Sequence, residues 1–503
     1  MTNTDLSPDI VIVGSGLGGS IIASKLAATG ASILILERGE PITPASEAIS
    51  EHAILVESRF VAREQWFDHR GKAFRPWMYY NVGGNTKYFG AVLSRFRETD
   101  FEETELPGGI SPAWPFRYTE LEPFYCEAER ILQVRGETGS DPCEPKRSCD
   151  YPLPASVDEA SVAKIRSRLD RIGIKTFKTP LCVDIPSWAA QTRLPWDGYP
   201  NVSVSKSDAE NSFLRPALSY SNVKVLSGSK VVRLDVNGNE RRINRVEVDV
   251  RGENTSITPK YVFLCAGAIN SAAILMRSES RDGKGLANSS GRVGRNLMAH
   301  HCSAVVAIDP LTRNDALYQK TVSFNDFYLS DGAGGKGLGH VQMLGKISEI
   351  AIQSMNYRIP RPVRKWIASH SVDWFAISED LPNLQSGVTV RSNGQIHLEW
   401  YRPNQIGHNL LLKKLRKVFR EAGYPLTFFK QWDIHHLTHQ CGTVCIGNNP
   451  ATAPLDPLCK SYDLENLWVV DASFLPTSSA VNPSLTVAAQ ALRVGDYLRH
   501  NLR

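Results

Sequence analysis

The sequence contains no uninterrupted apolar run of the 18 or so residues that a membrane-spanning helix requires. It also lacks a strong excess of charge, because 57 basic and 52 acidic residues give a net charge of +5 and are spread along the chain. This balance does not suggest a nucleic-acid partner. The polar start, Met1–Pro8, lacks the basic and apolar regions of a secretion signal. We therefore expect no membrane helix, no membrane or nucleic-acid partner and a cytoplasmic location.

Cysteine is scarce and dispersed. The nine cysteines form an odd set without the dense spacing of a secreted disulfide protein, so we expect most of them to be reduced. Cys441 and Cys445 lie four residues apart, but no second Cys/His pair at zinc-site spacing accompanies them. Free thiols are therefore favoured over a metal site, and we predict no metal.

The length and the apolar content permit a large core. A chain of 503 residues exceeds one ordinary domain, and 42% apolar with 22% charged residues is typical of a globular enzyme. We expect two lobes.

A dinucleotide-binding motif stands near the start of the chain. The apolar run Asp9–Val13 predicts a strand, Ser20–Thr29 predicts a helix, and the glycine-rich segment Gly14–Gly19 joins them. Gly14 permits the tight turn, Gly16 lets a pyrophosphate approach the backbone, and Gly19 lets the helix pack on the strand. A second predicted strand, Ser32–Leu36, ends on Glu37, which is 23 residues after Gly14 (37 − 14). An acid at about this offset holds an adenosine ribose, but the pattern leaves NAD and FAD open.

The middle of the chain mixes several patterns. In the aromatic-rich segment Ala45–Arg97, the Gly83–Gly84 pair is compatible with either a flat ligand against the backbone or an ordinary loop. Trp114–Pro115 and Thr119–Leu132 predict a turn and an amphipathic helix. Between Val202 and Val250, three apolar runs and a turn predict an antiparallel meander: Val223–Leu226, Val231–Val236, Val246–Val250 and the turn Val236–Asn239.

A second strand–turn–helix unit follows. Tyr261–Cys265 predicts a buried strand and Ile269–Met276 a helix, consistent with another element against the cofactor. Between Ser303 and Gln431 we expect substrate-side strands. They include a hairpin across Ser392–Gln395 and a basic helix at Asn409–Ala422. The end of the chain predicts a buried strand and a closing helix, at Leu467–Val470, before Asp471, and at Leu485–His500.

Histidines and an asparagine near the end carry the candidate chemistry. His435, His436 and His439 precede Gly442–Thr443, and Asn482 precedes Pro483 one strand and one loop later. Imidazole is suited to take a proton near neutral pH, and an amide can hydrogen-bond the same hydroxyl. Taken singly, each is more often structural.

Together these segments resemble the glucose-methanol-choline (GMC) oxidoreductases, over nearly the whole chain. The shared motifs occur in the family's order: Gly14–Glu37, Gly83–Gly84, Trp114–Pro115 with Glu120–Tyr125, Cys265–Leu275, Val293–Leu297, His439–Thr443 and Asp471–Val487. The resemblance implies FAD held by the first and last segments. Its catalytic pair matches His439 and Asn482, which makes His435 and His436 bystanders.

The resemblance also implies a fold and a set of FAD contacts. We expect an α/β fold with a Rossmann-like FAD-binding domain (1–44, 200–302 and 432–503) and an α+β substrate domain with an antiparallel sheet (45–199 and 303–431). The FAD-contacting residues that it implies are Gly14, Gly16, Leu17, Gly18, Gly19, Glu37, Arg38, Gly83, Gly84, Asn85, Val232, Ala266, Gly267, Asp471, Ala472, Asn482, Pro483 and Thr486. Some members tether FAD through a histidine after the diglycine. Tyr88 stands there in this chain, so we predict non-covalent FAD.

The segment Thr438–Thr443 is most similar to bacterial pyranose oxidases and glycoside 3-oxidase-like sugar oxidoreductases. We therefore expect oxidation of a secondary hydroxyl of a sugar or glycoside, with hydride transfer to flavin N5, His439 as base and oxygen, a quinone or another electron acceptor. Sterols, amino sugars and a redox-silent lyase remain open. Trp366, Trp374 and Trp400 could stack on a sugar, although core positions are the commoner use of tryptophan.

Overall fold

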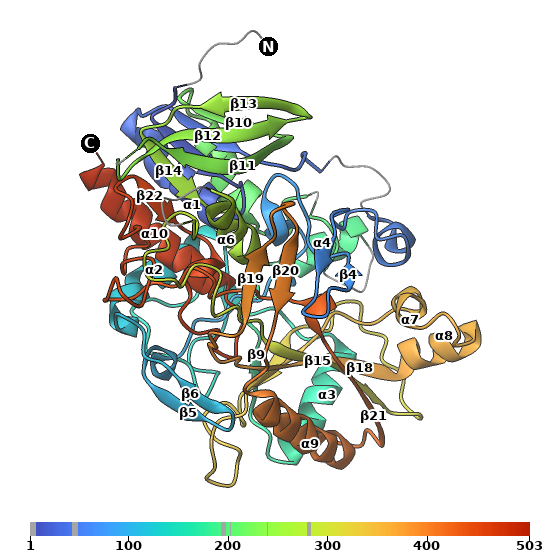
Figure 1. Ribbon diagram of the computed structural model, residues 1–503. Coiled ribbons are helices and arrows are strands. Elements are labelled where there is room, and N and C mark those ends of the chain that lie inside the picture. The colour runs from blue at the N-terminus through green and yellow to red at the C-terminus, as the bar shows by residue number, and fades with distance from the viewer. Residues whose placement is uncertain are drawn as a thin grey trace.

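The fold is described from a computed structural model, which covers residues 7–42, 49–192, 198–201, 203–238, 240–278 and 283–502. It contains two principal sheets, one near each end of the molecule in Figure 1. Residues 45, 202 and 239, which bounded predicted segments, lie outside the described residues. Within the described part, every helix is too short or too polar to span a bilayer. The cytoplasmic location stays a prediction.

The first sheet is entirely parallel, with every residue of β1 and β2 buried. In a parallel sheet both faces are covered, which explains why these strands are continuous apolar runs. The neighbours of β1 are β2 and β14, so the sheet extends from β1 in both directions. The strand order therefore reverses at β1, and in parallel sheets ligands bind at the carboxyl ends of the strands beside such a switch point. The strand order is β10 (Val223–Leu226), β2 (Ile33–Leu36), β1 (Ile10–Val13), β14 (Tyr261–Leu264) and β22 (Leu467–Val469).

Helices packed around this sheet complete the Rossmann-like unit. In Figure 1 α1 and α10 lie beside it, with α2 packed on α10. The side chains of Tyr125 and Thr486 join α2 and α10 by a hydroxyl–hydroxyl contact of 2.6 Å. The helices are α1 (Leu17–Leu26), α2 (Tyr118–Ile131), α5 (Arg215–Leu218), α6 (Ala268–Arg277) and α10 (Ser484–Asn501).

The predicted meander is correct for two of its three strands. β11 (Ser229–Val236), β12 (Ile243–Val250) and β13 (Glu253–Ile257) form an antiparallel sheet. Val223–Leu226, which we assigned to the same meander, instead forms β10 and pairs in parallel with β2. Its apolar alternation is compatible with either sheet. The choice depends on a distant partner that a local pattern does not reveal.

The second large sheet is antiparallel. Its faces carry a core separate from that of the parallel sheet, and α3 and α9 lie against it in Figure 1. The order is β21 (Leu426–Gln431), β15 (His301–Ile308), β18 (Ser371–Ser378), β17 (His340–Met343), β16 (Val322–Phe324) and β9 (Thr176–Lys178). Its helices are α3 (Ala160–Arg171), α7 (Glu349–Met355), α8 (Arg361–His370) and α9 (Gln405–Glu421).

Smaller elements connect the two parts. The predicted hairpin at Ser392–Gln395 is confirmed, because β19 and β20 pair antiparallel around it. The remaining strands are β19 (Gly387–Val390), β20 (Ile396–Glu399), β3 (Trp66–Phe67), β4 (Ala73–Phe74), β5 (Thr104–Leu106), β6 (Gly109–Ser111), β7 (Arg135–Gly136) and β8 (Leu153–Pro154), and the remaining α-helix is α4 (Ile185–Thr192). Short 3-10 or π turns are η1 (Ala27–Thr29), η3 (His52–Val56), η4 (Gly84–Lys87), η5 (Glu98–Phe101), η6 (Glu210–Leu214), η7 (Ile434–His436) and η8 (Ala472–Phe474).

The expected fold class, a Rossmann-like domain with an antiparallel substrate-side sheet, is confirmed by this arrangement. The five parallel strands fall within 1–44, 200–302 and 432–503. The antiparallel sheet falls within 45–199 and 303–431, apart from the first two residues of β15. We propose these boundaries as the division into two domains.

One disulfide joins α2 to the loop after it, between Cys126 and Cys149. The other seven cysteines are free, so the prediction that most thiols are reduced is confirmed. Spacing alone did not single out this pair, because the loop between the two cysteines carries no repeated cysteine pattern. Cys441 and Cys445 form no disulfide, and the Cys445 thiol donates to the Gly442 carbonyl; the absence of a metal stays a prediction.

Candidate active site

A cavity of about 460 Å³ lies between the two parts of the molecule. One wall is made by the carboxyl ends of the parallel strands and the turns that follow them, including Gly14, Glu37, Ala266 and Asp471. The other wall comes from the antiparallel sheet and its loops, and its members are Lys320, Gln342, Leu344, Phe375 and Trp432. A ligand in this cavity therefore contacts both parts of the chain.

The glycine-rich turn after β1 is crowded except at one position. A Cβ on Gly18 would lie 1.7 Å from the Val470 carbonyl oxygen, and one on Gly19 would lie 2.1 Å from that of Gly14. Gly14 has a φ of +99°, which a side chain rarely adopts. A Cβ on Gly16 would meet nothing within 4 Å, and this residue lines the cavity. Gly14, Gly18 and Gly19 thus permit close packing, whereas Gly16 leaves space for a ligand.

Glu37 lines the same wall at the end of β2. Its carboxylate accepts hydrogen bonds from the backbone N–H and hydroxyl of Ser15, at 3.0 and 2.7 Å, and from the backbone N–H of Gly39 at 2.8 Å. Burial raises the pKa of Glu37, although these donors act in the opposite direction. The Oε2 atom accepts both Ser15 bonds, whereas Oε1 accepts only from Gly39 and retains a lone pair, so Glu37 can still accept a ribose hydroxyl at Oε1.

The diglycine loop lies directly against the glycine-rich turn. The backbone N–H of Gly83 donates to the Ser15 hydroxyl at 3.1 Å, and a Cβ on Gly84 would lie 2.8 Å from the Cα of Gly16. Both glycines have positive φ values. Of the two sequence alternatives, the structure therefore supports a close backbone approach at the cavity over an ordinary loop. Gly84 and the predicted contact Asn85 both line the cavity.

The ends of β14 and β22 are joined through Asp471. Its carboxylate accepts from the Gly267 backbone N–H at 2.9 Å and from the Ser271 hydroxyl at 2.5 Å. Desolvation by burial raises the pKa of Asp471. Ala266 and Ala472 complete this part of the cavity lining, so the two strand–turn–helix units predicted from sequence meet here.

Most predicted cofactor residues line the cavity, including Leu17, Arg38 and Pro483, but four do not. Gly19 and Gly83 lie behind the lining glycines, and Thr486 hydrogen-bonds Tyr125. Val232 is 36% exposed on β11, and its neighbour Val231 lines the cavity instead. Tyr88 lines the cavity and stacks on Tyr79 at 3.8 Å. Non-covalent attachment of FAD stays a prediction.

The predicted catalytic residues His439 and Asn482 both line the cavity, whereas His435 and His436 lie outside its lining. His439 has a left-handed backbone (φ +55°), which is uncommon for residues other than glycine. The Asn482 Oδ1 atom is buried and has no hydrogen-bond partner among the described residues. A buried amide oxygen without a partner is costly, so Asn482 is suited to a bound ligand.

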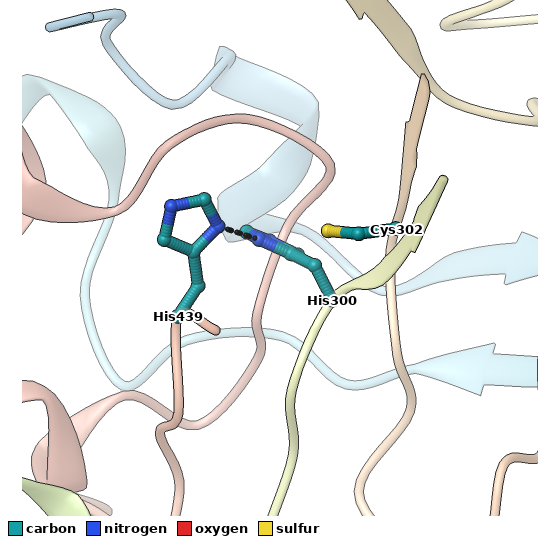
Figure 2. A group of neighbouring side chains, drawn as sticks. All are labelled: His300, Cys302 and His439. Atoms are coloured by element: carbon teal, nitrogen blue, oxygen red, sulfur yellow. Dashed lines mark hydrogen bonds between the residues drawn. The ribbon is translucent and has the colours of Figure 1, made fainter. Parts of the chain in front are cut away.

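The protonation of His439 follows from a chain of hydrogen bonds, part of which Figure 2 shows. The Nε2 atom of buried His300 lies 2.9 Å from the carbonyl oxygen of Ser478, and a carbonyl only accepts, so His300 Nε2 carries the proton. Neutral His300 then accepts at Nδ1, which lies 2.8 Å from Nδ1 of His439. His439 must therefore donate from Nδ1, which leaves a lone pair on its Nε2.

Both histidines are neutral near pH 7. Burial lowers the pKa of His300 to about 4. Desolvation lowers the pKa of His439 well below its usual 6.5, and the neighbouring His300 and Lys320 add to the effect. Lys320 is buried, donates to the Gly90 carbonyl at 3.0 Å and lines the cavity. The site thus holds an uncharged imidazole with an available lone pair.

Cys302 lies beside the two histidines in Figure 2, and one potential ligand atom from each of the three residues falls within 4.8 Å of the others. The two Nδ1 atoms are 2.8 Å apart. Two nitrogens bound to a tetrahedral zinc lie about 3.3 Å apart. The 2.8 Å separation of the two Nδ1 atoms is therefore that of a hydrogen bond between the histidines, and not that of two ligands on one zinc ion.

The substrate-side residues were missed by sequence reasoning. Of the three tryptophans considered, Trp374 is fully buried, Trp366 is on the surface, and Trp400 donates to Asp380 at 2.7 Å. None of them lines the cavity, where Trp432 and Phe375 lie instead. His300 was also missed. The available signal was its position three residues after the Val293–Leu297 motif.

The fold and the cavity define a protein with a Rossmann-like nucleotide-binding unit, and its relatives make it an FAD-dependent oxidoreductase that acts on alcohol groups. Family models for GMC oxidoreductase match residues 198–302 (N-terminal model) and 404–491 (C-terminal model), and a model for an NAD(P)-binding Rossmann-like domain matches residues 12–81. The chain belongs to the GMC oxidoreductases.

Similar proteins span nearly the whole chain. The 6'''-hydroxyparomomycin C oxidase of Streptomyces lividus is 27% identical, with 98% of this chain and 92% of the relative covered. The paromamine 6'-oxidase of Streptomyces fradiae is 28% identical, with coverage of 96% and 90%. Pyridoxine 4-oxidase from Mesorbium loti has a similar fold, with a TM-score of 0.66, 20% identity and coverage of 98% and 99%.

Proposed function

We propose that this protein oxidises a secondary hydroxyl of a neutral sugar or glycoside, with His439 as the general base. The observation that carries the proposal is the hydrogen-bond chain from Ser478 through His300, which leaves the lone pair on Nε2 of a histidine that lines the cavity. A neutral imidazole in this tautomer can accept a hydroxyl proton.

The residues of the cavity fit FAD. The open space beside Gly16 and the unpartnered Oδ1 of Asn482 are both suited to a ligand, and Glu37 stands at the strand end where a ribose is held. The glycine-rich turn before α1 presents a helix N-terminus to the pyrophosphate. The chemistry that bound FAD supplies is two-electron acceptance, at flavin N5, of the hydride from the carbinol carbon.

The protein's own groups handle the proton and the oxygen. His439 takes the hydroxyl proton at Nε2 and becomes an imidazolium that still donates from Nδ1 to His300. Asn482 donates from its amide to the alkoxide-like oxygen and so positions the carbinol. His300 keeps its own proton on Nε2, hydrogen-bonded to the Ser478 carbonyl. The substrate proton therefore stays on His439 until the product leaves.

The polarity of the substrate-side wall favours a neutral polyhydroxylated substrate over a sterol. Gln342, Thr438 and Gln440 offer hydrogen-bonding groups, and Phe375 and Trp432 offer flat apolar faces. Sugars need both kinds of surface. A sterol would cover these polar groups and offer them at most its single hydroxyl.

Amino sugars are the second candidate, because the two relatives above are named for paromomycin- and paromamine-type substrates. The charge of the cavity is less favourable to them. Among the described lining residues the carboxylates are Glu37 and Asp471, both on the nucleotide-side wall, while Lys320 lies on the substrate side near His439. A cationic amine there would lie near the like charge of Lys320, while both lining carboxylates stand on the opposite wall.

Anaerobic reduction of the flavin tests the proposal. We expect a neutral glycoside or pyranose to bleach the flavin absorbance faster than paromamine or a sterol. Admission of oxygen, and separately of a quinone, then identifies the acceptor. A cyanohydrin that is cleaved without any bleaching would instead establish a lyase. Release of the flavin on denaturation checks that it is held non-covalently.

Replacement of His439, the proposed base, should slow reduction of the flavin. His439→Ala should retain FAD and lose about a hundred- to ten-thousand-fold in the rate of flavin reduction, because proton abstraction is lost. Stopped-flow absorbance under anaerobic conditions measures that rate, and His436→Ala, outside the cavity lining, is the matched control. An unchanged rate in His439→Ala would remove this residue from the mechanism.

A further inference from the structure

Helix α8 departs from the pattern of an ordinary surface helix. A surface helix normally buries its apolar stripe and exposes its charges. In α8, Val363 and Trp366 are 45% and 39% exposed, whereas Arg364 is buried. The Arg364 guanidinium donates inward to the Ile359 carbonyl at 2.8 Å and to the Gln353 side chain at 3.2 Å. The arginine thus anchors the helix while Val363 and Trp366 stay exposed and Ile367 and Ala368 are half-buried.

The segment before α8 extends this apolar surface. Met355, at the end of α7, is 56% exposed, and Tyr357 is 75% exposed. In Figure 1, α7 and α8 project from one side of the molecule. We call the exposed side chains of Met355, Tyr357, Arg358, Val363, Lys365 and Trp366 the α7–α8 patch.

The charge around these residues is positive. Residues 349–370 contain four arginines or lysines and a single acid, Glu349, which pairs with Arg361 at 3.1 Å. Arg358 and Lys365 are exposed, and in the described part of the chain neither has a carboxylate within ion-pair distance. The patch therefore combines outward apolar and aromatic side chains with uncompensated cations.

We propose that the α7–α8 patch docks the protein on an anionic lipid surface. Amphipathic helices that lie in a membrane interface have this composition, with tryptophan and aliphatic residues entering the headgroup region and Lys or Arg meeting acidic lipids. A stable protein interface needs about 20–30 residues on each side, whereas the exposed apolar residues here are confined to a short projecting segment, 355–366. The cytoplasmic leaflet carries the anionic lipids that such a patch requires.

This proposal changes one expectation from the sequence, where the absence of a long apolar run was taken to exclude any membrane partner. Peripheral docking needs no such run. The docked segment is also connected to the cavity, because residues 344–370 join β17 to β18, and Gln342, Leu344 and Phe375 from this region line the substrate-side wall.

Vesicle co-sedimentation of the FAD-loaded protein tests the proposal. We expect binding to vesicles that contain phosphatidylserine and little binding to pure phosphatidylcholine, with the difference reduced by salt. Trp366→Ala should lower the partition coefficient about tenfold. Arg358→Gln and Lys365→Gln should each lower it about fivefold. Phe428→Ala, which removes a 59% exposed side chain from β21, should have no effect.

Three results would overturn the proposal: no sedimentation of the wild-type protein with phosphatidylserine vesicles, equal binding of Trp366→Ala, or a dimer in solution that Trp366→Ala dissociates. The last result would make the patch an interface between copies of this chain. All patch variants should keep wild-type rates of flavin reduction in solution, because none of the replaced residues lines the cavity. A failure of the proposed sugar chemistry would leave the vesicle result unaffected.

Discussion

The position of a single proton decides whether His439 can act as a base. That proton is directed by His300, whose own N–H is committed to the Ser478 carbonyl. Without an acceptor at His300 Nδ1, His439 would populate both tautomers, and one of them carries its hydrogen on Nε2, where the substrate proton has to go. We therefore assign His300 a positioning role.

Two substitutions of His300 distinguish positioning from simple packing. His300→Leu should reduce the rate of flavin reduction about 10- to 1,000-fold, because Nδ1 of His439 loses its acceptor. His300→Gln should retain much more of the rate, because its carbonyl can accept from His439 while its amide donates to Ser478. Stopped-flow kinetics with matched FAD content measures both. Equal losses in the two variants would contradict the tautomer argument.

The charge of Lys320 controls the pH range of the site. His439 is active when neutral, so kcat/KM should fall as the pH drops through its lowered pKa, below 6.5. Lys320→Met removes a positive charge that disfavours the imidazolium, so the pKa should rise and the acidic fall should move toward neutral pH. The pH profile of kcat/KM measures the shift. Lys230→Met, on the nucleotide-side wall, is the control. An unmoved profile would show that this charge does not act on His439.

At the scale of single residues, the sequence locates His439 and Asn482, because His439 lies three residues before Gly442 and Asn482 directly before Pro483. It does not locate His300 as their partner. The hydrogen bond between His300 and His439 joins residues 139 positions apart, and such a contact exists only after the start of β15 and the C-terminal segment are packed together. Lys320, Phe375 and Trp432 escaped prediction for the same reason.

Among the elements, the turn between β1 and α1 offers a matched pair of glycines. Gly18→Ala should destabilise the protein, because its Cβ would overlap the Val470 carbonyl at 1.7 Å, whereas the Cβ of Gly16→Ala has free space. Gly16→Ala should therefore fold with nearly wild-type stability and bind FAD more weakly, since its methyl group occupies ligand space. Thermal melting of the apoprotein and flavin titration separate the two effects. Equal FAD affinity in Gly16→Ala would place the ligand elsewhere.

Elements with a strong local pattern were predicted well. The apolar runs at β1, β2 and β14, the amphipathic pattern of α2 and the basic pattern of α9 are local properties, and the structure confirms each within a few residues. The pairing of strands is not a local property. Strand β10 has the same pattern as the neighbouring meander strands and yet belongs to the parallel sheet. The burial of Arg364 in α8 also depends on contacts outside the helix, since its acceptors lie on the preceding segment.

For the whole molecule, the two sheets alternate along the chain, so neither forms from one continuous segment. The sequence predicts this alternation because apolar β-branched strands return after the long polar-patterned middle region. It does not reveal the buried acidic groups where the parts meet. Ser111 donates to Glu379 at 2.5 Å, next to Asp380 and near Asp100. Burial, with the neighbouring carboxylates, raises the pKa of Glu379 from 4.5 to about 8.

This buried carboxyl should make the stability of the molecule depend on pH. Its folded pKa lies above the unfolded value, so its contribution to the free energy of unfolding is fully present below pH 4.5 and is lost as the pH rises through about 8.

Glu379→Gln keeps an acceptor for Ser111 and cannot ionise. Its free energy of unfolding should match the wild type near pH 4.5 and exceed it above pH 8, by at most about 1.4 kcal/mol for each unit of the pKa shift. Denaturant unfolding at the two pH values measures the difference. Glu253→Gln, at an exposed position of β13, should show no such trend. A constant difference between Glu379→Gln and the wild type would mean that Glu379 is already ionised in the folded protein.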